Sequence, residues 1–470
     1  MSVLDSSSVV AVNQSFDAAT LISSLRNTFN QGRTQSASWR LHQLKQMRAM
    51  LCDHWDEFVE AVSADSGRPS FEAWTGDLAM SLGEIDAALN GLKNWMKPRR
   101  AKAPATVMLG SAWIMPEPLG VGLVIAPWNY PFELALNPVI GAIAAGNCVA
   151  IKPSELAPKT SAALAKRIPE YMDTEGIAVV EGGIPETEAL LAEKLDHIFY
   201  TGNGHVARIV LAAAAPHLTP VVLELGGKSP CIVAHDANID VTARRICHGK
   251  FYNAGQTCIA PDYVLVDERV KNTLIDRMKL AVEQFYGMEP KQSPDFGRIA
   301  NDRHHARLAG LLEEQAVVVG GQVDARERYI APTIVRDSPP ESAVMQEEIF
   351  GPILPVIGVS DLDTAVSFVN SRPKPLALYV FTENRNTEKD LLTRVTAGGA
   401  CVNSVMIHGT SPDLPFGGVG ESGMGRYHGR SSFEVYSHFK TVVRHSTKLD
   451  LPLVYPPYSK IKMAVVKKLI

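Results

Sequence analysis

The chain has 470 residues, which is too long for one ordinary domain and suggests two to four domains with large cores. Lys and Arg total 46 and Asp and Glu total 50, which gives a net charge of −4 without any long basic run. Proteins that bind nucleic acid carry concentrated positive charge, so this composition excludes that class and favours a small-molecule substrate. Hydrophobic residues make up 46% and charged residues 20%, so little disorder is expected beyond the ends.

Targeting signals and cysteines indicate the compartment. Residues 1–16 lack a positive leader and an uninterrupted apolar core, so no secretory signal is predicted. The longest apolar region, 121–146, is broken by Pro, Asn and Glu residues that a membrane span would rarely tolerate. The six cysteines form no CxxC pair or His-Cys cluster, which predicts neither a metal site nor a disulfide framework. We therefore expect a cytoplasmic protein without a membrane span, with a short docked helix in its basic tail, 460–470.

The first half of the chain changes from helical to strand periodicity. Apolar side chains recur at helical spacing over residues 18–97 and predict several amphipathic helices. After a break at 97–104, short apolar runs alternate with helical segments. These five predicted strands cover 120–127, 147–153, 177–183, 197–203 and 220–227. Continuous apolar strands that alternate with helices predict a parallel sheet covered on both faces, hence a doubly wound α/β domain.

A second α/β pattern follows and predicts another domain over about 227–412. A long helix is expected over 269–286. The predicted strands are 230–235, 263–268, 316–321, 331–335, 353–359 and 376–382. The closing stretch 415–443 is Gly-rich and then strand-like. Ligands of such sheets bind beyond the carboxyl ends of the strands, where Gly, Pro and polar residues gather in this chain.

Three side chains are candidates for chemistry. Cys258, in the turn "NAGQTC", is either a buried small hydrophobe or a nucleophile. Glu224 ends an apolar strand before a double glycine, a place that suits a general base or a strand-end ion pair. Asn129 lies in "PWNYP" and could donate a hydrogen bond to an oxyanion or satisfy its own turn. Taken singly, none of them decides between the two interpretations.

Further candidates could bind a dinucleotide. "FYTGNG" (199–204) places a Gly-Asn-Gly turn before a helix, where phosphate can meet backbone N–H groups, although the GxGxxG pattern is absent. Lys152 and Glu155 in "KPSE" could bind ribose hydroxyls or form a surface pair. "EEIFGP" (347–352) combines carboxylates with Phe350 and a turn, which is also compatible with an ordinary loop beside the core.

Together, these motifs give the chain a specific resemblance. In this order it contains "PWNYP", "KPSE", "FYTGNG", "LELGGKSP", "NAGQTC", "EEIFGP" and "PFGGVGESGMGRYHG". Over nearly its whole length it resembles the aldehyde dehydrogenase superfamily. "NAGQTCIAPDYVLV" and "YPPYSK" make it similar to the class 3 branch, which includes bacterial coniferyl-aldehyde-type enzymes. It departs from the family at Asn203, where Ser or another small residue is usual, and at His205.

The resemblance implies a reaction and three catalytic residues. Cys258 would attack an aldehyde, aromatic or medium to long aliphatic, and form a thiohemiacetal and then a thioester. The amide of Asn129 and the backbone N–H of Cys258 would stabilise the oxyanion. Glu224 would activate the water that releases the carboxylic acid.

The resemblance also implies a cofactor and an architecture. The cofactor is expected to be NAD, with NADP possible, held by Trp128, Lys152, Glu155, Gly202, Asn203, Glu348 and Phe350. The NAD-binding domain would comprise 1–97 and 122–226, the catalytic domain 227–412, the bridging segments 98–121 and 413–450, and the C-terminal tail 451–470. Class 3 members are commonly dimers, so a homodimer is expected.

Two other kinds of protein would share this fold. A CoA-acylating dehydrogenase or a semialdehyde-forming reductase would keep the cysteine but would not need a carboxylate to activate water, so Glu224 argues against both. A catalytically silent NAD-binding or structural protein would not need Cys258, Glu224 and Asn129 together. Reduction of the nicotinamide by an aldehyde, with and without CoA, distinguishes these alternatives.

Overall fold

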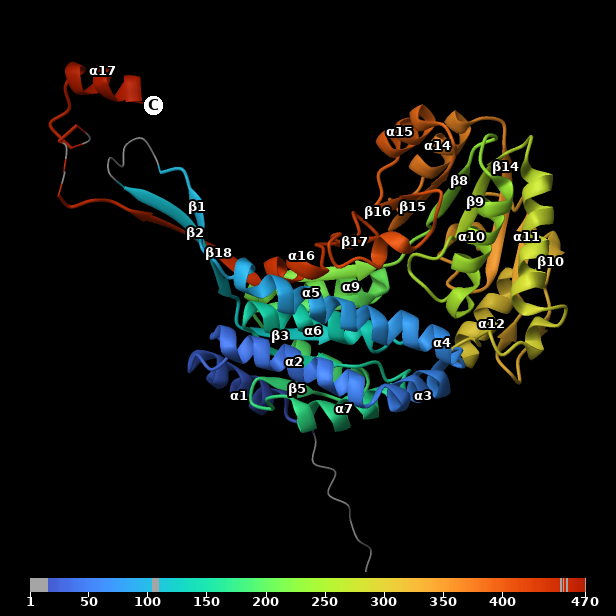
Figure 1. Cartoon of the computed structure of the whole chain (residues 1–470), viewed down its shortest axis with the longest axis horizontal. Coiled ribbons are helices and arrows are strands. Elements are labelled where there is room, and N and C mark those ends of the chain that lie inside the picture. The colour runs from blue at the N-terminus through green and yellow to red at the C-terminus, as the bar shows by residue number, and fades with distance from the viewer. Residues whose placement is uncertain (1–15, 104–109, 449, 451, 454, 470) are drawn as a thin grey trace, which may run out of the picture.

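A computed structural model describes residues 16–103, 110–448, 450, 452–453 and 455–469. The sequence-based expectation about a secretory signal falls on residues that are almost all outside these ranges. Figure 1 shows two sheet-containing bodies beside each other and a narrow arm that extends from the first of them.

The chain begins with a layer of helices whose ends are set by local signals. Asp17 and Ser36 cap helices by accepting hydrogen bonds from backbone N–H groups of the first turn, and left-handed Gly67 ends a third. The helices are α1 (Ala18–Asn30), α2 (Ala37–Asp53), α3 (Trp55–Ser66), α4 (Ser70–Ala73), the π-helical turn η1 (Trp74–Leu78) and α5 (Ala79–Trp95). The prediction of several helices over residues 18–97 is confirmed.

The first sheet has six strands in the order β17-β7-β6-β3-β4-β5. Its strands are β3 (Val121–Ile125), β4 (Cys148–Lys152), β5 (Ile177–Val179), β6 (His197–Gly202), β7 (Val221–Leu225) and β17 (Gly423–Met424). All pairs are parallel except the short edge pair of β17 with β7. The crossover helices are α6 (Glu133–Ala145), α7 (Pro158–Tyr171), α8 (Ile184–Leu191) and α9 (Gly204–Ala214).

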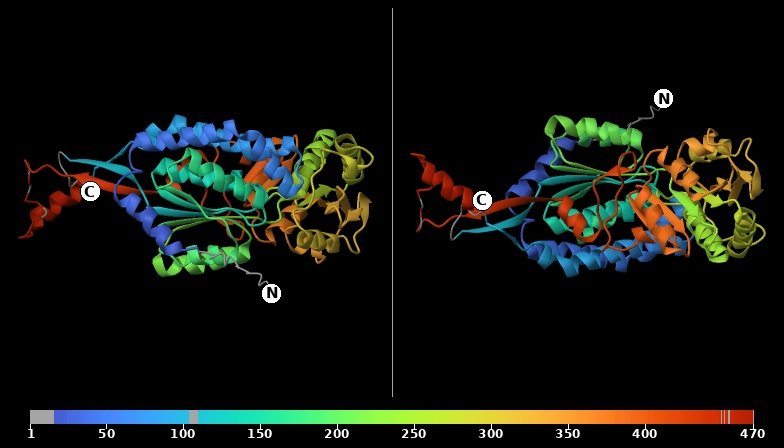
Figure 2. Two further views of the ribbon diagram at one scale, coloured as in Figure 1. Left: turned by 90° about the horizontal axis from the view of Figure 1, so that it is seen from below. Right: turned by 90° about the horizontal axis from the view of Figure 1, so that it is seen from above.

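The side chains of these strands point alternately to the two faces of the sheet, so the apolar core is divided into two parts. Val124, Ile151 and Phe199 pack with α2, α5, α6 and α7, whereas Leu123 and Ile198 pack with α1, α8 and α9 on the opposite face. Figure 2 shows helices on both sides of this sheet. The sheet is therefore doubly wound, as predicted, and α6 is buried along its whole length.

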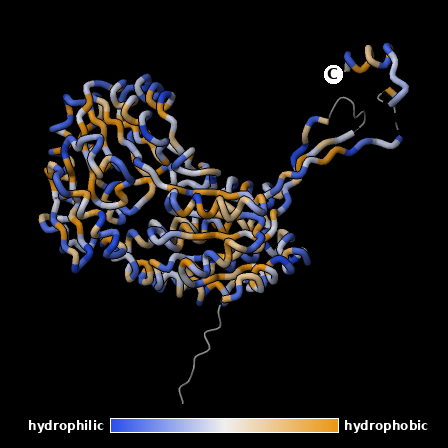
Figure 3. The backbone as a smooth tube through the Cα atoms, turned by 180° about the vertical axis from the view of Figure 1, so that it is seen from behind, coloured by the Kyte–Doolittle hydropathy of each residue, from blue (hydrophilic) through white to orange (hydrophobic). Residues whose placement is uncertain are grey.

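The second sheet has seven strands in the order β10-β13-β14-β9-β8-β15-β16. They are β8 (Pro230–Val233), β9 (Tyr263–Asp267), β10 (Val317–Val319), β13 (Thr333–Arg336), β14 (Ile353–Val359), β15 (Ala377–Phe381) and β16 (Gly399–Val402). Only edge strand β10 is antiparallel to its neighbour. The helices are α10 (Ile239–Phe251), α11 (Lys271–Tyr286), α12 (Asp302–Leu311), α13 (Ala343–Gln346), α14 (Leu362–Asn370) and α15 (Arg385–Arg394). Figure 3 shows hydrophobic segments, in orange, inside each body. The predicted α/β class with two parallel sheets is confirmed.

An antiparallel sheet forms the arm. Strand β2 (Ser111–Pro118) pairs with β1 (Arg99–Ala101), which shortly precedes it in the chain, and with β18 (Ser437–Arg444), which lies far later in the chain. Helix α17 (Lys460–Leu469) lies at the tip of the arm, away from both large sheets, so the expectation that it docks on the protein body is wrong (Figure 1). The segment before β18 contains β17 and α16 (Gly429–Val435), which pack with the first body. The predicted domain boundaries themselves stay a prediction.

Three general chemical features complete the description. The cysteines of the described ranges are all unpaired. Within the same ranges, no group of three or more His, Cys, Asp or Glu side chains is arranged to hold a metal ion. No helix that the structure describes combines the length and apolar character needed to cross a bilayer.

Candidate active site

Cys258 follows a tight turn that needs glycine. After α10 the backbone takes the left-handed conformation at Asn253 (φ 53°), Ala254 (φ 49°) and Gly255 (φ +75°). A side chain on Gly255 would collide with the carbonyl oxygen of Gly351. The cysteine turn of the second body is thereby packed directly against the "FGP" turn of residues 350–352.

Hydrogen bonds from distant segments fix this turn. The Gln256 amide donates to the carbonyl oxygens of Asn253 (3.0 Å) and Arg298 (2.9 Å) and accepts the backbone N–H of Ala300 (2.9 Å). The backbone N–H of Asn253 donates to a carboxyl oxygen of Glu72, in α4, at 2.8 Å. All the polar atoms of the Gln256 side chain are therefore engaged, which holds the residues before Cys258 in one conformation.

We expect Gly255→Ala to lower stability more than Gly287→Ala does. Gly287 has a similar φ of +76° but nothing lies within 4 Å of an added Cβ, so that change is expected to cost about 1 kcal/mol of backbone strain. At Gly255 the collision with Gly351 adds about 1–3 kcal/mol. Denaturant titration of both variants, followed by fluorescence, checks the difference. Equal destabilisation would show that the contact with Gly351 is unimportant.

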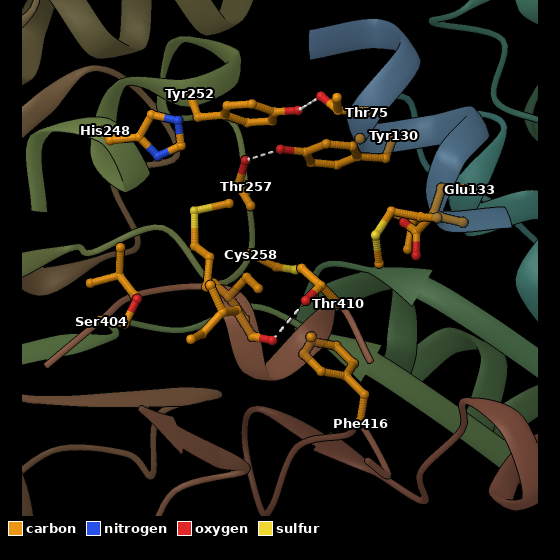
Figure 4. A pocket seen from close by; sticks show the side chains of 18 of the residues that line it. Thr75, Tyr130, Glu133, His248, Tyr252, Thr257, Cys258, Ser404, Thr410 and Phe416 are labelled. Atoms are coloured by element: carbon orange, nitrogen blue, oxygen red, sulfur yellow. Dashed lines mark hydrogen bonds between the residues drawn. The ribbon is translucent and has the colours of Figure 1, made fainter. Parts of the chain in front are cut away.

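Asn129 connects the loop after β3 to the cysteine turn. It is buried, and its side-chain Nδ2 donates to the backbone carbonyl oxygen of Gln256 at 3.0 Å. The backbone carbonyl oxygen of Asn129 accepts a hydrogen bond from Nδ2 of Asn253 at 3.0 Å. Next to it, the hydroxyls of Tyr130 and Thr257 are hydrogen bonded at 2.6 Å (Figure 4). Because a primary amide carries two N–H groups, Asn129 keeps one for another acceptor.

A buried ion pair supports the loop that contains Asn129. Arg68 and Asp77 are both completely buried and form a salt bridge. The other oxygen of Asp77 accepts the backbone N–H groups of Phe132 (2.9 Å) and Glu133 (3.0 Å), at the start of α6. Asp77 therefore satisfies N–H groups that have no partner within the helix, and it fixes where α6 begins.

Glu224 is a buried carboxyl near Cys258. It lies on β7 between Thr201 of β6 and Gly423 of β17, and its Oε1 has no hydrogen-bond partner among the described residues. Burial and then the Glu133 carboxylate raise the pKa of Glu224 well above the ordinary value of 4.5. Glu224 therefore favours the neutral form in the absence of ligands.

The Cys258 thiol is surrounded by carboxyl groups. Burial, followed by Glu224, Glu348 and Glu133, raises the pKa of Cys258 well above 9.0, and the residue's own backbone N–H acts in the opposite direction. Three carboxyl groups thus act on the charge of one sulfur. All three are themselves pushed toward the neutral form by burial, which reduces the charge that opposes a thiolate.

A cavity of about 590 Å³ leads to the sulfur. Most of its wall is apolar or aromatic and comes from α4, α6, α10, α11 and the segments 404–410 and 416–428. Figure 4 shows Cys258 among Thr75, Glu133, Thr257 and Phe416. This combination of an apolar cavity and a few polar groups is typical of a small-molecule site.

A second cavity, of about 650 Å³, lies beside Glu348. A side chain on Gly226 would collide with the Glu348 carboxyl, and the backbone N–H of Gly227 donates to that carboxyl. Burial and then Asp262 raise the pKa of Glu348 to about 8. Because Gly226 has no side chain, the Glu348 carboxyl packs directly on the glycine backbone at the wall of the cavity.

The aromatic rings of Trp128 and Phe350 pack against each other. Their ring centroids are 5.5 Å apart with an edge-to-face angle of 84°. Phe350 has a φ of +50°, which is strained for a residue with a large side chain. Backbone strain of this kind is found at functional sites more than elsewhere, and here it fixes an aromatic ring next to the "PWNYP" loop.

The other predicted cofactor residues lie along the carboxyl edge of the first sheet. Lys152 ends β4 and is buried, with Nζ donating to the Pro153 carbonyl oxygen at 2.6 Å and 3.6 Å from the half-exposed Glu155 carboxylate. Gly202 ends β6, and Asn203 caps α9 by accepting the backbone N–H of Val206 at 3.0 Å. The helix-capping role gives a physical reason for an asparagine at this position.

The structure thus groups the sequence candidates into three sets. Cys258 lines the first cavity, Asn129 is hydrogen bonded to the cysteine turn, and the Glu224 carboxyl acts on the Cys258 thiol. Trp128 and Phe350 pack against each other, and Glu348 lines the second cavity. The third set follows the sheet edge and comprises Lys152, Glu155, Gly202 and Asn203. Sequence reasoning missed Tyr130, Glu133, Thr257, Glu72 and Asp77. Tyr130 and Thr257 adjoin Asn129 and Cys258 in the chain and could have been noted, but nothing in the sequence connects the other three to the cysteine.

A doubly wound sheet with glycines and polar side chains at its strand ends, beside an apolar cavity that contains a thiol, is typical of an enzyme that binds a dinucleotide. The aldehyde dehydrogenase family profile matches residues 7–442. Aldehyde dehydrogenase family 3 member H1 of Arabidopsis thaliana is 48% identical over 97% of this chain and 95% of its own length. The dimeric NADP-preferring aldehyde dehydrogenase of Rattus norvegicus is 48% identical over 88% of this chain and 91% of its own.

Solved structures agree with this assignment. AldH of Staphylococcus aureus, in a substrate-bound state, superposes with a TM-score of 0.93 at 44% identity, covering 96% of this chain and 98% of that one. The chain belongs to the aldehyde dehydrogenase family. The resemblance to the class 3 branch is confirmed, and the protein is an NAD(P)-dependent enzyme that oxidises aldehydes.

Proposed function

We propose that Cys258 is the nucleophile of a non-acylating oxidation of aldehydes to carboxylic acids. The proposal is carried by three observations: Cys258 lines an apolar cavity, Asn129 is hydrogen bonded to the cysteine turn, and the Glu224 carboxyl acts on the Cys258 thiol. As the thiolate, Cys258 adds to the carbonyl carbon and forms a thiohemiacetal. The N–H of Asn129 that Gln256 does not use and the backbone N–H of Cys258 stabilise the oxyanion.

Glu224 acts in the second half of the reaction, the hydrolysis of the thioester. A bound nicotinamide would supply the hydride acceptor, and once the former aldehyde carbon has lost its hydride, Cys258 would carry a thioester. In its ionised form, Glu224 takes a proton from water, and the resulting hydroxide attacks the thioester carbon. Cys258 leaves as a thiolate and the carboxylic acid is released. The unpartnered Oε1 of Glu224 supports this role because it has room to accept that proton.

The sites for the cofactor fit a dinucleotide. Lys152 and Glu155 would bind the adenine ribose, and Gly202 with the capped α9 start at Asn203 would face the pyrophosphate. Glu348, Phe350 and Trp128 would bind the nicotinamide side, where glycines 226 and 227 leave a cavity open. The carboxylate of Glu155 disfavours a 2′-phosphate, which supports NAD as the preferred cofactor.

Absorbance of the reduced nicotinamide tests this function. The enzyme is expected to oxidise an aldehyde with NAD in the absence of CoA, more efficiently than with NADP. A strict requirement for CoA would favour an acylating enzyme, and no turnover with any aldehyde in a broad panel would indicate a silent protein. A panel of aromatic and aliphatic aldehydes in the same assay defines the substrate preference.

We further propose that the protein is a cytoplasmic homodimer. The unpaired cysteines support a reducing compartment, and the arm carries exposed apolar side chains at Phe439 and Val443 that a second copy would cover. Light scattering on the purified chain is expected to give about twice the subunit mass of 51.0 kDa. A mass equal to one subunit at micromolar concentration would contradict the dimer.

A further inference from the structure

Glu133 is a carboxyl group in the wall of the aldehyde cavity to which the reaction assigns no task. It is the first residue of α6, it is 8% exposed, and it lines the same cavity as Cys258 (Figure 4). Its position is set from two sides. Asp77 accepts its backbone N–H at 3.0 Å, and Nδ2 of Asn137, one turn later, donates to its Oε1 at 2.9 Å.

The second carboxyl oxygen of Glu133 has no donor. Among the described residues, no N–H or O–H group hydrogen bonds to Oε2, and the neighbouring wall of the cavity contains Met80 and Leu134. Oε2 is not fully buried, so it is open to the cavity, where the hydroxyl of a ligand can form a hydrogen bond with it in place of water. Glu133 thus provides a fixed polar atom in a mostly apolar cavity.

This polar atom lies close to the reacting centre. Glu133 is the carboxyl neighbour that acts on the Glu224 carboxyl, and it also acts on the Cys258 thiol. Burial, followed by Asp77 and Glu84, raises the pKa of Glu133 well above 4.5 and favours its neutral form. A neutral carboxyl can both donate and accept a hydrogen bond.

The chemistry of the cavity selects among possible ligand groups. Arg244 and Arg245 line the same cavity, so an ammonium group would meet positive charge on its way to Glu133. A carboxylate would pair with these arginines rather than with the Glu133 carboxyl. A hydroxyl is uncharged and can donate to or accept from the neutral Glu133, so it matches the site best.

We propose that Glu133 determines specificity by binding a hydroxyl group that the aldehyde carries close to its carbonyl carbon. The proposal rests on the proposed function, because it assigns the preferred substrates of that same site to the hydroxyaldehydes. Its physical basis is the combination of a fixed carboxyl, one open oxygen and an apolar surrounding. Enzymes that hydrogen bond a substrate hydroxyl discriminate strongly against analogues that lack it.

Paired substrates test the proposal. The ratio of kcat/KM for a hydroxyaldehyde to that for its parent, such as 3-hydroxypropanal to propanal and 2-hydroxybenzaldehyde to benzaldehyde, is measured for the wild type and for Glu133→Leu. The ratio cancels any effect of the substitution on the shared chemical steps. We expect at least one wild-type ratio to exceed unity by about tenfold and to fall to about one in E133L. A wild-type ratio above unity that E133L leaves unchanged would overturn the proposal.

Two further variants make the result specific. Glu133→Gln keeps a donor and an acceptor and is expected to retain most of the preference, whereas a loss as complete as that in E133L would contradict hydroxyl binding by a neutral acid. Glu57→Gln removes a carboxylate that does not line the cavity and does not act on Glu133, and it is expected to leave the ratio unchanged. If E133L does not fold, Glu133→Met supplies a flexible apolar side chain for the same comparison.

The outcomes separate this proposal from the proposed function. If the wild type oxidises the parent aldehydes but gains nothing from a hydroxyl group in either pair, the role of Glu133 is wrong and the function stands. If the wild type oxidises no aldehyde at all, the proposed function fails first.

Discussion

Replacing Cys258 by Ser is expected to lower kcat/KM for every aldehyde by at least about a thousandfold. A serine hydroxyl is far less acidic than a thiol, and the buried carboxyl groups around this position disfavour an anion still further. Steady-state oxidation measures the loss. Binding of NAD, followed by quenching of tryptophan fluorescence, is expected to be retained because the proposed cofactor residues are unchanged.

A second cysteine provides the control for this substitution. Cys52 is exposed on α2, and Cys52→Ser is expected to leave the rate unchanged. Turnover by C258S at a rate comparable with the wild type would refute the nucleophile assignment. A loss of NAD binding together with activity would instead show that the turn had been disrupted, so circular dichroism of the variant accompanies the assay.

Glu224→Gln is expected to slow steady-state turnover by about a hundredfold to a thousandfold while leaving formation of the thioester nearly intact. The glutamine has the same shape but cannot take a proton from water. Mixing the variant with aldehyde and NAD should therefore give a rapid burst of one reduced nicotinamide per site, followed by a slow phase. Mass spectrometry of the intact protein should detect the acyl group on Cys258 during the slow phase.

The control for E224Q is a carboxylate outside the site. Glu57 forms surface ion pairs with Arg167 and Lys166, and Glu57→Gln is expected to show no burst and an unchanged rate. An unchanged steady-state rate in E224Q would remove Glu224 as the general base. Loss of both the burst and the slow phase would place its role before hydride transfer.

The sheets could be predicted from the sequence because their strands are continuous apolar runs that end in turn residues. Val121–Ile125 and Tyr263–Asp267 are buried at every position, which is the pattern that a strand covered on both faces requires. Strand β16 was not predicted. Its sequence, "GACV", contains one strand-forming residue and its burial is irregular, so tertiary pairing with β15 determines its conformation.

The residues of the site could be predicted only where they belong to a recognised sequence motif. Cys258, Asn129 and Glu224 were selected because their local sequences match those of a known family. Glu133 and Asp77 were missed because they lie in segments where a helix pattern explains every residue without a functional role. Their contribution depends on contacts across more than 50 residues of sequence, such as that between Asp77 and the start of α6, and periodicity contains no information about such contacts.

The supports of the cysteine turn are spread along the chain from Glu72 to Gly351. A ribosome completes the cysteine itself well before it adds the segments around residues 298 and 351. During part of its synthesis the chain therefore contains Cys258 without the contacts that hold the cysteine turn. The complete set of contacts forms only when about three quarters of the protein has been made. Fragments that end before Gly351 should consequently be inert toward aldehydes, which keeps covalent chemistry out of unfinished molecules.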